Sequence, residues 1–474
     1  MAYDALTKQI LQKITPKPEE RTKINALSHK LEQQIAIAIE TENINAIVRV
    51  EGSIAKDTYL SQNTDIDIFM RLPTSIPRKN LGDIALRIAK KAAGDAEQIE
   101  RFAEHPYLEI FIDNYRIDIV PCYDTTPGEW QSATDRTPYH TDYIQTHLAP
   151  QLLDEVRLLK KFMQGIGVYG AEIKIGGFSG YLCELLVMKY GSFAKVIEAF
   201  SGYSKRIVID IENVYSQRER ELELLFPEPL VIVDPVDKGR NVASAVQTQK
   251  LYEFIAASRA FQKAPSEEFF YPSLVHAVPP NQLEKRLEHC CSSFLFLVIG
   301  ELTAVPDILW GQLCRTKRSL RTLLETNDYK VLRDTVWSNE NALNIFVFEL
   351  EQTILPNVKK HLGPQLERQI ESENFLAKYT QDQRVHAGPY IEDGRWIVQV
   401  ARKNVNAAEL FKEKLADGGK NAGVAELVAK AIVADSKILV NSEVLKVYVE
   451  HADFAVAFTA FIDGQPFWLK TQPS

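Results

Sequence analysis

Two aspartates alternate with isoleucines in the stretch Asp65-Ile66-Asp67-Ile68-Phe69, which has a period of two. Successive side chains of a β-strand point to opposite faces, so both carboxylates should lie on one face and both isoleucines on the other. The isoleucine face can enter a core, and the carboxylate face can hold hard divalent cations. Upstream, Gly52-Ser53 closes another predicted strand, and its backbone N–H groups and hydroxyl can hold an anion.

The length of 474 residues is too great for one hydrophobic core and predicts two to four domains. No run approaches the roughly 18 apolar residues of a membrane span, and the first residues do not form a signal-peptide pattern. The five scattered cysteines form no Cys-x-x-Cys pair, which argues against a zinc site and favours a reducing, cytoplasmic location. A net charge of −8 argues against non-specific coating of nucleic acid but does not exclude a local basic surface.

The first third of the chain predicts two helices followed by a small mixed sheet. Apolar residues at helical spacing over 5–43 are interrupted at Thr15-Pro16-Lys17-Pro18, which separates the two helices. Asp113-Asn114 is a tight hairpin signal. The order of elements is not the strict alternation of a doubly wound fold. The predicted strands are Ala46–Glu51, Thr64–Leu72, Gln98–Ala103, Tyr107–Asp113 and Tyr115–Val120, with one helix at Leu81–Ala93.

The rest of the chain predicts a helical region and then a second mixed region, so the fold class is multidomain α+β. A stretch rich in Pro and Ser, residues 264–280, marks a boundary between them. The predicted elements are helices at Leu152–Met163, Tyr181–Tyr190, Asn241–Lys263 and Ile308–Asn327, and a buried strand at Phe294–Ile299.

A third aspartate, Asp118, repeats the pattern between Ile117 and Ile119. Nucleotidyl transfer needs a hydroxyl aligned with a phosphorus and the developing charge neutralised, and two divalent ions about 4 Å apart do both. Such ions are usually held by three carboxylates. Alternating Asp and Ile can also be the solvated face of a half-buried strand. Two such strands in one sheet, and the poor strand propensity of Asp, favour metal-dependent nucleotidyl transfer.

The stretches Gly52–Leu60 and Asp65–Phe69 together resemble the signature of the DNA polymerase β-like nucleotidyltransferase superfamily. Further strings narrow the resemblance to the archaeal, class I CCA-adding enzymes. It is strong from about residue 30 to 262, and beyond that it is weaker but compatible in layout. The strings are Arg136–His140, Glu155–Lys160, Gly167–Glu172, Gly177–Glu184, and Asp234–Asp237 with Arg240–Val242.

This resemblance implies addition of C, C and A to tRNA 3′ ends from CTP and ATP, with Mg²⁺ and no nucleic-acid template. It makes Asp65, Asp67 and Asp118 metal ligands at a two-metal site, and Asp118 would also help to activate the 3′-hydroxyl. Arg240 would help to select the incoming base. The residues that would contact the nucleotide's triphosphate are Gly52, Ser53, Lys56, His140, Lys160 and Tyr169.

Two positions depart from the family's usual residues. Lys56 stands where the family often has Arg, and Asp65 where it often has Glu. Lysine keeps the charge but loses the bidentate fork, and aspartate is one methylene shorter. Each nucleotide-site residue also has a plainer interpretation: His140 as a surface histidine, Lys160 as a solvated lysine, Tyr169 as a core residue and Arg240 as a loop arginine.

The resemblance also divides the chain. Residues 1–145 would form the catalytic palm domain with its N-terminal helices, 146–265 a helical central domain, and 266–474 a C-terminal α/β body and tail that binds tRNA. Phosphate contacts must then be local, because the net charge is negative. Arg315, Arg318 and Arg321 step by three along one helix and are the candidate RNA contacts, although a solvated helix face is the alternative.

Two other functions remain open on the sequence alone. One is a different template-independent polymerase, such as a poly(A) polymerase, and the other is a non-catalytic RNA-binding relative. The presence of all three aspartates argues against the second. Whether the protein acts as a monomer or as a homodimer is also left open.

Overall fold

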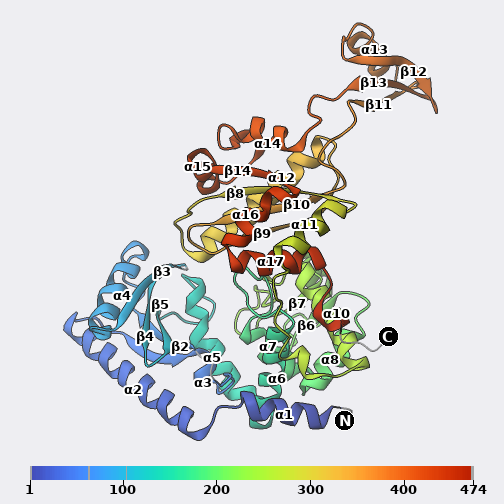
Figure 1. Ribbon diagram of the computed structural model, residues 1–474. Helices are drawn as coiled ribbons and strands as arrows, with labels where there is room; N and C mark the ends of the chain where they lie inside the picture. The colour runs from blue at the N-terminus through green and yellow to red at the C-terminus, as the bar shows by residue number, and fades with distance from the viewer. Residues whose placement is uncertain (1–2, 62–64, 103, 471–474) are drawn as a thin grey trace. The chain divides into compact units, whose positions relative to one another are not determined.

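The structure is a computed structural model that describes residues 3–61, 65–102 and 104–470. The chain divides into two compact units (Figure 1). The first unit contains the chain up to Leu274 together with the segment from Gln465 onward, and the second spans Val275–Gly464. No helix in the described ranges is long and apolar enough to cross a membrane.

The first unit begins with two helices and a five-stranded sheet, as the sequence predicts. The observed bounds agree with the predicted ones to within a few residues, and Thr64 and Ala103, which the predicted strands included, lie outside the described residues. Asp113 and Asn114 both have positive φ, as a tight hairpin requires. The elements are α1 (Asp4–Ile14), α2 (Pro18–Thr41), β1 (Ile47–Glu51), α3 (Gly52–Ala55), β2 (Asp65–Leu72), α4 (Arg78–Ala93), β3 (Glu97–Phe102), β4 (Pro106–Ile112) and β5 (Tyr115–Tyr123).

The strand order of this sheet is β1-β2-β5-β4-β3, with β2 and β5 parallel and the other pairs antiparallel. Helices α2 and α4 cover one face (Figure 1). Ile66, Ile68, Ile117 and Ile119 are fully buried in the core beneath these helices. Because side chains alternate along a strand, the aspartates between them point to the opposite face. The sheet therefore presents its carboxylates away from the α2/α4 layer.

Helices dominate the remainder of the first unit and pack around an aromatic core. Phe162 lies at its centre, in ring contact with Phe193, Phe254, Phe261, Phe269 and Phe270. The elements are α5 (Thr137–His147), α6 (Leu153–Gly165), α7 (Gly180–Tyr190), α8 (Phe193–Ser201), α9 (Glu219–Leu225), α10 (Thr248–Lys263) and α18 (Phe467–Lys470), with the two-stranded pair β6 (Ile207–Ile209) and β7 (Leu230–Ile232).

One predicted helix start is wrong. The helix expected from Asn241 begins at Thr248. Asn241 lies outside it because its side chain bonds to the backbone of β7. Its side-chain oxygen accepts from the backbone N–H groups of Ile232 (3.0 Å) and Ala243 (2.9 Å), and its amide donates to the Leu230 carbonyl (3.0 Å). Asn favours such local side-chain to backbone bonds, which compete with helix formation.

The second unit contains two sheets. Strand β8 lies inside a four-stranded sheet of order β14-β8-β10-β9, and its residues alternate between two buried clusters, one on each face. Strands β11, β13 and β12 form a separate small sheet with α13 against it (Figure 1). Both units thus mix helices with sheets, which confirms the α+β class.

The elements of the second unit are α11 (Pro280–His289), β8 (Ser293–Ile299), α12 (Pro306–Thr326), β9 (Val331–Ser338), β10 (Asn344–Leu350), β11 (Val358–Gln365), α13 (Gln369–Tyr379), β12 (Val385–Glu392), β13 (Arg395–Ala401), α14 (Ala407–Leu415), α15 (Glu426–Ala434), β14 (Ser436–Val440), α16 (Leu445–Glu450) and α17 (Ala452–Asp463). The predicted strand at Phe294–Ile299 and the predicted helix at Ile308–Asn327 correspond to β8 and α12, each within two residues.

Candidate active site

A row of four carboxylates crosses the sheet from β1 to β4. The strand register places Glu51 opposite Asp67, Asp67 opposite Asp118, and Asp118 opposite Glu109. Directly opposed residues share a face of a sheet, so all four side chains point to the same side. The sequence predicts the two aspartates of this row, while Glu51 and Glu109 emerge only from the register.

The two ends of the row are neutralised differently from its middle. Glu51 pairs with Arg49 at 2.8 Å, and Glu109 pairs with Arg101 at 2.8 Å. Among the described residues, Glu51 Oε1 and Asp118 Oδ1 are both buried oxygens without a hydrogen bond, but Glu51 Oε1 has the Arg49 guanidinium at 2.8 Å, whereas the Arg116 contact of Asp118 is to its other oxygen, Oδ2. Buried polar atoms in native proteins are rarely left unpartnered. The middle of the row therefore offers carboxylate oxygen to a cation.

The pKa values of the two central aspartates reflect this excess of negative charge. Burial, and then repulsion from Asp118 and Asp65, raises the pKa of Asp67 to about 7. Burial raises the pKa of Asp118 to about 6, with neighbouring Glu109 and Asp65 acting in the same direction. Loss of hydration and crowding of like charges both penalise the ionised carboxyl. A divalent cation relieves both penalties, so the residues present fit a metal of this kind.

The third aspartate, Asp65, is held by Arg116. The guanidinium Nη2 lies 2.5 Å from Asp65 Oδ2 and 3.4 Å from Asp118 Oδ2. Within the ranges that the structure describes, no cluster of three or more His, Cys, Asp or Glu side chains is arranged closely enough to hold a metal ion. The strand register nevertheless makes the predicted ligands Asp65, Asp67 and Asp118 neighbours on one face, where Arg116 contacts two of them.

Gly52 lies directly against Asp67. Its φ is +68°, and a Cβ at this position would stand 2.1 Å from Asp67 Oδ2. That separation is far below a van der Waals contact, so a larger residue must displace the carboxylate. Glycine is therefore required here both by the backbone conformation and by the approach of the aspartate.

Replacing Gly52 by alanine is expected to lower the rate of the nucleotidyl transfer that the sequence resemblance implies by about a hundredfold, because a displacement of 1 Å in a catalytic group has that order of effect. Gly94→Ala is the matched control. Gly94 also has positive φ (+57°), but no atom lies within 4 Å of the added Cβ. Initial rates and thermal melts of both variants separate the backbone strain, which they share, from the clash with Asp67. Equal rates in the two variants would contradict the proposed contact.

Beside the carboxylates lies a pocket of about 380 Å³. The predicted nucleotide residues that line it come from α3, α6 and the loop before α7, so the fold brings together positions more than 100 residues apart. The lining residues are Gly52, Ser53, Lys56, Tyr59, Leu60, Asp65, Asp67, Lys160, Gln164, Tyr169, Gly180, Tyr181 and Glu184.

Glu184, which the sequence analysis did not single out, joins the two lysines of this pocket. Its Oε2 lies 2.6 Å from Lys56 Nζ, and its Oε1 lies 3.2 Å from Lys160 Nζ and 2.6 Å from Thr58 Oγ1. Burial alone would raise the pKa of Glu184, but the two lysines outweigh it and hold this pKa below its usual value. Burial, reinforced by repulsion from Lys56, lowers the pKa of Lys160. The pocket thus contains two ammonium groups held by Glu184, with Asp65 and Asp67 also in its lining.

His140 and Arg240 meet at a second buried carboxylate, Asp234. His140 Nε2 lies 2.9 Å from Asp234 Oδ2, Arg240 Nη1 lies 2.7 Å from the same oxygen, and the Tyr181 hydroxyl donates to Oδ1 (3.2 Å). The His140 ring also stacks on Tyr181, with centroids 4.1 Å apart. Tyr181 lines the pocket, so it connects this cluster to the lysines.

The sequence contains a weak signal for the buried carboxylate of Glu184. Glu184 lies in a helix that otherwise reads Gly-Tyr-Leu-Cys-Glu-Leu-Leu-Val, where one charged residue is surrounded by buried apolar ones. A fully buried Glu must be paired, so the residue could have been suspected. Its partners, Lys160 and Lys56, lie 24 and 128 positions away, so the sequence alone could not identify them.

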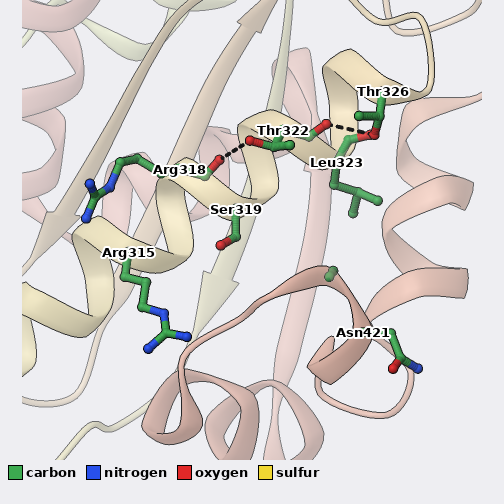
Figure 2. A pocket seen from close by; sticks show the side chains of 8 residues that line it. Arg315, Arg318, Ser319, Thr322, Leu323, Thr326 and Asn421 are labelled. Atoms are coloured by element: carbon green, nitrogen blue, oxygen red, sulfur yellow. Dashed lines mark hydrogen bonds between the residues drawn. The ribbon is translucent and has the colours of Figure 1, made fainter.

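The predicted RNA contacts lie on α12 of the second unit, where a hollow of about 460 Å³ opens beside the helix (Figure 2). Arg315 and Arg318 line it together with Asn421 from the facing segment, and neither arginine has an acidic partner among the described residues. Arg321 differs, because it pairs with Asp334 at 2.5 Å and Glu325 at 2.9 Å. The structure thus brings two of the three arginines to the same surface.

Three family models match consecutive parts of the chain. The nucleotidyltransferase domain covers residues 32–140, the second domain of tRNA nucleotidyltransferase covers 154–271, and the C-terminal domain of CCA-adding enzyme covers 292–441. The CCA-adding enzyme of Methanosarcina barkeri is 38% identical over 86% of this chain and 88% of its own length. That of Halobacterium salinarum is 32% identical over 97% of this chain and 98% of its own.

Solved structures show only a distant likeness. A structure of the Cid1 poly(U) polymerase is 16% identical, covers 56% of this chain and 99% of its own, and has a TM-score of 0.44. This likeness adds nothing to the argument.

A sheet with a row of carboxylates beside a cationic pocket, in the region matched by a nucleotidyltransferase domain, defines the chain as a nucleotidyltransferase. The other two family models and the relatives extend the match along nearly the whole chain. The chain belongs to the CCA-adding enzyme family. It is a tRNA nucleotidyltransferase that adds C, C and A to the 3′ end of tRNA without a nucleic-acid template.

Proposed function

We propose that Asp65, Asp67 and Asp118 hold divalent cations, with Mg²⁺ as the physiological ion at a two-metal site, for the transfer of CMP and AMP from CTP and ATP with release of pyrophosphate. The observation that carries this proposal is the unpartnered, buried Oδ1 of Asp118 next to Asp67, whose pKa is raised to about 7. Bound there, the cations would align the reacting oxygens and neutralise charge at the phosphorus. The chain's residues then supply the ligands and the rigid strands that carry them.

We propose that Asp118 also takes the proton from the 3′-hydroxyl of tRNA. Its pKa of about 6 lies close enough to neutral pH for a base to be mostly ionised and still able to accept a proton. Its neighbour Asp67 carries the higher pKa, about 7. We therefore assign proton removal to Asp118 and metal binding to all three aspartates.

The pocket beside the carboxylates is the proposed site of the triphosphate. Lys56 and Lys160 supply two positive charges, and Ser53 supplies a hydroxyl at the start of α3. Glycine at position 52 lets the backbone N–H groups approach a phosphate closely. Tyr169 lines the same pocket. The charges and donors therefore match an anion with several phosphates.

The family resemblance implies a triphosphate contact for His140, but its bond to Asp234 groups it with Arg240, and we propose that these two residues form the edge of the base pocket. Both are oriented by Asp234, so they act as one rigid hydrogen-bonding unit. Discrimination against U and G needs such polar complementarity, because a wrong base leaves buried polar groups unpaired. Arg240 is one-third exposed and remains accessible to a ligand.

The proposed function is tested on a tRNA that ends before its CCA. With CTP, ATP and Mg²⁺ the purified protein should extend this end by C, C and A and then stop, and a chelator should abolish the extension. Extension by A alone, or formation of long tails, would instead assign a poly(A) polymerase. Extension that resists the chelator would contradict the role of the three aspartates.

We propose that the hollow beside α12 contacts phosphates of tRNA through Arg315 and Arg318. Both guanidiniums lack an acidic partner among the described residues, whereas Arg321 is already engaged by Asp334 and Glu325. Recognition by backbone and shape suits an enzyme that must accept every tRNA. Arg321 is therefore the weakest member of the predicted set.

Replacing both Arg315 and Arg318 by alanine is expected to weaken tRNA binding and to reduce the slope of log K against log salt by about one for each arginine. Arg321→Ala is the matched control and should leave the slope nearly unchanged. Binding isotherms at several salt concentrations measure both. A double variant with the wild-type slope would rule out these phosphate contacts.

A further inference from the structure

Arg116 contacts two of the proposed metal ligands and also lies near a carboxylate outside the ligand set. It projects from β5 on the carboxylate face, two residues before Asp118 and in register with Asp65 of β2. Its Nη2 contacts Asp65 Oδ2 at 2.5 Å and Asp118 Oδ2 at 3.4 Å. One guanidinium therefore bridges two of the three residues assigned to the metal.

A guanidinium bonded to a carboxylate opposes the binding of a divalent cation at the same carboxylate, because like charges a few ångströms apart repel. Arg116 contacts Oδ2 of both Asp65 and Asp118, so an ion held by these two residues would lie beside a positive charge. The contact of Arg116 with Asp65 is therefore one that a bound ion weakens. Arg116 and Asp65 are both nearly half exposed, so the side chains have space to separate.

A second acceptor for Arg116 is already in place. Glu109, the next residue in the carboxylate row after Asp118, has its Oε2 3.8 Å from Arg116 Nε. Arg101 bonds to the other oxygen, Oε1, of the same carboxylate. A small rotation of the Arg116 side chain toward Glu109 would exchange a contact with a metal ligand for one with a residue outside the ligand set.

We propose that Arg116 is an internal counter-ion of the metal site: it neutralises Asp65 and Asp118 when no divalent cation is bound, turns toward Glu109 when one binds, and thereby sets the concentration of cation that the enzyme needs. This inference rests on the proposed function, because it takes Asp65, Asp67 and Asp118 as the ligands. The role belongs to the side chain's charge and reach, since a lysine at this position would keep the charge but could not bridge Asp65 and Asp118 with one planar group.

The test is direct binding of Mn²⁺ to the full-length protein, followed by the electron paramagnetic resonance signal of the unbound ion. Arg116→Gln should bind Mn²⁺ about three- to tenfold more tightly than the wild type, the range expected when a partly exposed ion pair no longer competes. Arg116→Lys should fall between the two. The Mg²⁺ concentration for half-maximal transfer should fall in the same order.

Arg49→Gln is the matched control, because Arg49 lies on the same face and pairs with Glu51 at the other end of the row. Its removal deletes the same charge without freeing a proposed ligand, so its Mn²⁺ affinity should stay within about twofold of the wild type. Unchanged or weaker binding in Arg116→Gln, or equal tightening in both variants, would overturn the inference. If Asp67→Asn binds Mn²⁺ as the wild type does, the metal assignment itself fails, which is a separate result.

Discussion

Replacement of Asp67 by asparagine is expected to reduce nucleotide transfer by a thousandfold or more while leaving tRNA binding unchanged. Asp67 occupies the centre of the carboxylate row, between Glu51 and Asp118, and faces the triphosphate pocket. An amide keeps the shape of the side chain but loses the charge that holds a cation, and metal-assisted charge stabilisation contributes several kcal/mol to such reactions. Single-turnover rates with CTP, measured beside tRNA binding isotherms, give both quantities.

The melting temperature of Asp67→Asn shows whether its loss of activity comes from lost metal binding or from unfolding. A carboxyl whose pKa is raised in the folded state destabilises that state increasingly as the pH rises from the unfolded-state pKa to the folded-state pKa, and fully above the latter, because the ionised form is penalised in the folded protein. The pKa of Asp67 is raised to about 7, so without metal at pH 8 the Asn variant should melt at a higher temperature than the wild type. Asp83→Asn, on the exposed side of α4, is the control and should change neither activity nor melting. Substantial turnover in Asp67→Asn would break the metal assignment.

Replacement of Glu184 by glutamine is expected to damage both stability and nucleotide binding. The change leaves Lys56 and Lys160 close together in the protein interior without their counter-charge. Breaking a buried ion pair by removing one partner costs about 3–5 kcal/mol. The KM values for CTP and ATP should both rise at least tenfold, because the lysines no longer hold their positions at the pocket. Thermal melts and steady-state kinetics measure these effects.

A purely structural role for Glu184 makes a different prediction about anions. If Glu184 positions the lysines, pyrophosphate should raise the melting temperature of Glu184→Gln less than that of the wild type, whereas a purely structural role would leave the increase the same. Glu184→Asp, which keeps the charge, should recover part of the nucleotide affinity. Glu198→Gln, on the exposed face of α8, serves as the control. Equal stabilisation by pyrophosphate in variant and wild type would show that Glu184 does not position the lysines.

Local patterns in the sequence predicted the parts of this enzyme that depend on neighbouring residues. Alternation of Asp and Ile predicted β2 and β5 and the face of their carboxylates, since strand periodicity is set by the backbone. The hairpin at Asp113-Asn114 followed from residues that tolerate positive φ.

What the sequence alone missed depends on contacts between distant segments. Glu109 joins the carboxylate row only through the register of β4 with β5. Arg116 of β5 contacts Asp65 of the neighbouring strand β2. Glu184 and Asp234 are defined by partners far along the chain. The apolar spacing after Asn241 predicts a helix that starts at this residue. The helix starts later because the Asn241 side chain bonds to β7. Periodicity carries no information about such pairings.

The central claim is that the carboxylates of β2 and β5 hold the cation that nucleotidyl transfer requires. The most direct test is a Mn²⁺ titration of the wild-type enzyme, Asp67→Asn and Asp118→Asn in the presence of CTP and without tRNA. The account predicts saturable binding in the wild type and at least tenfold weaker binding in each variant. Binding of equal affinity in all three proteins would contradict it.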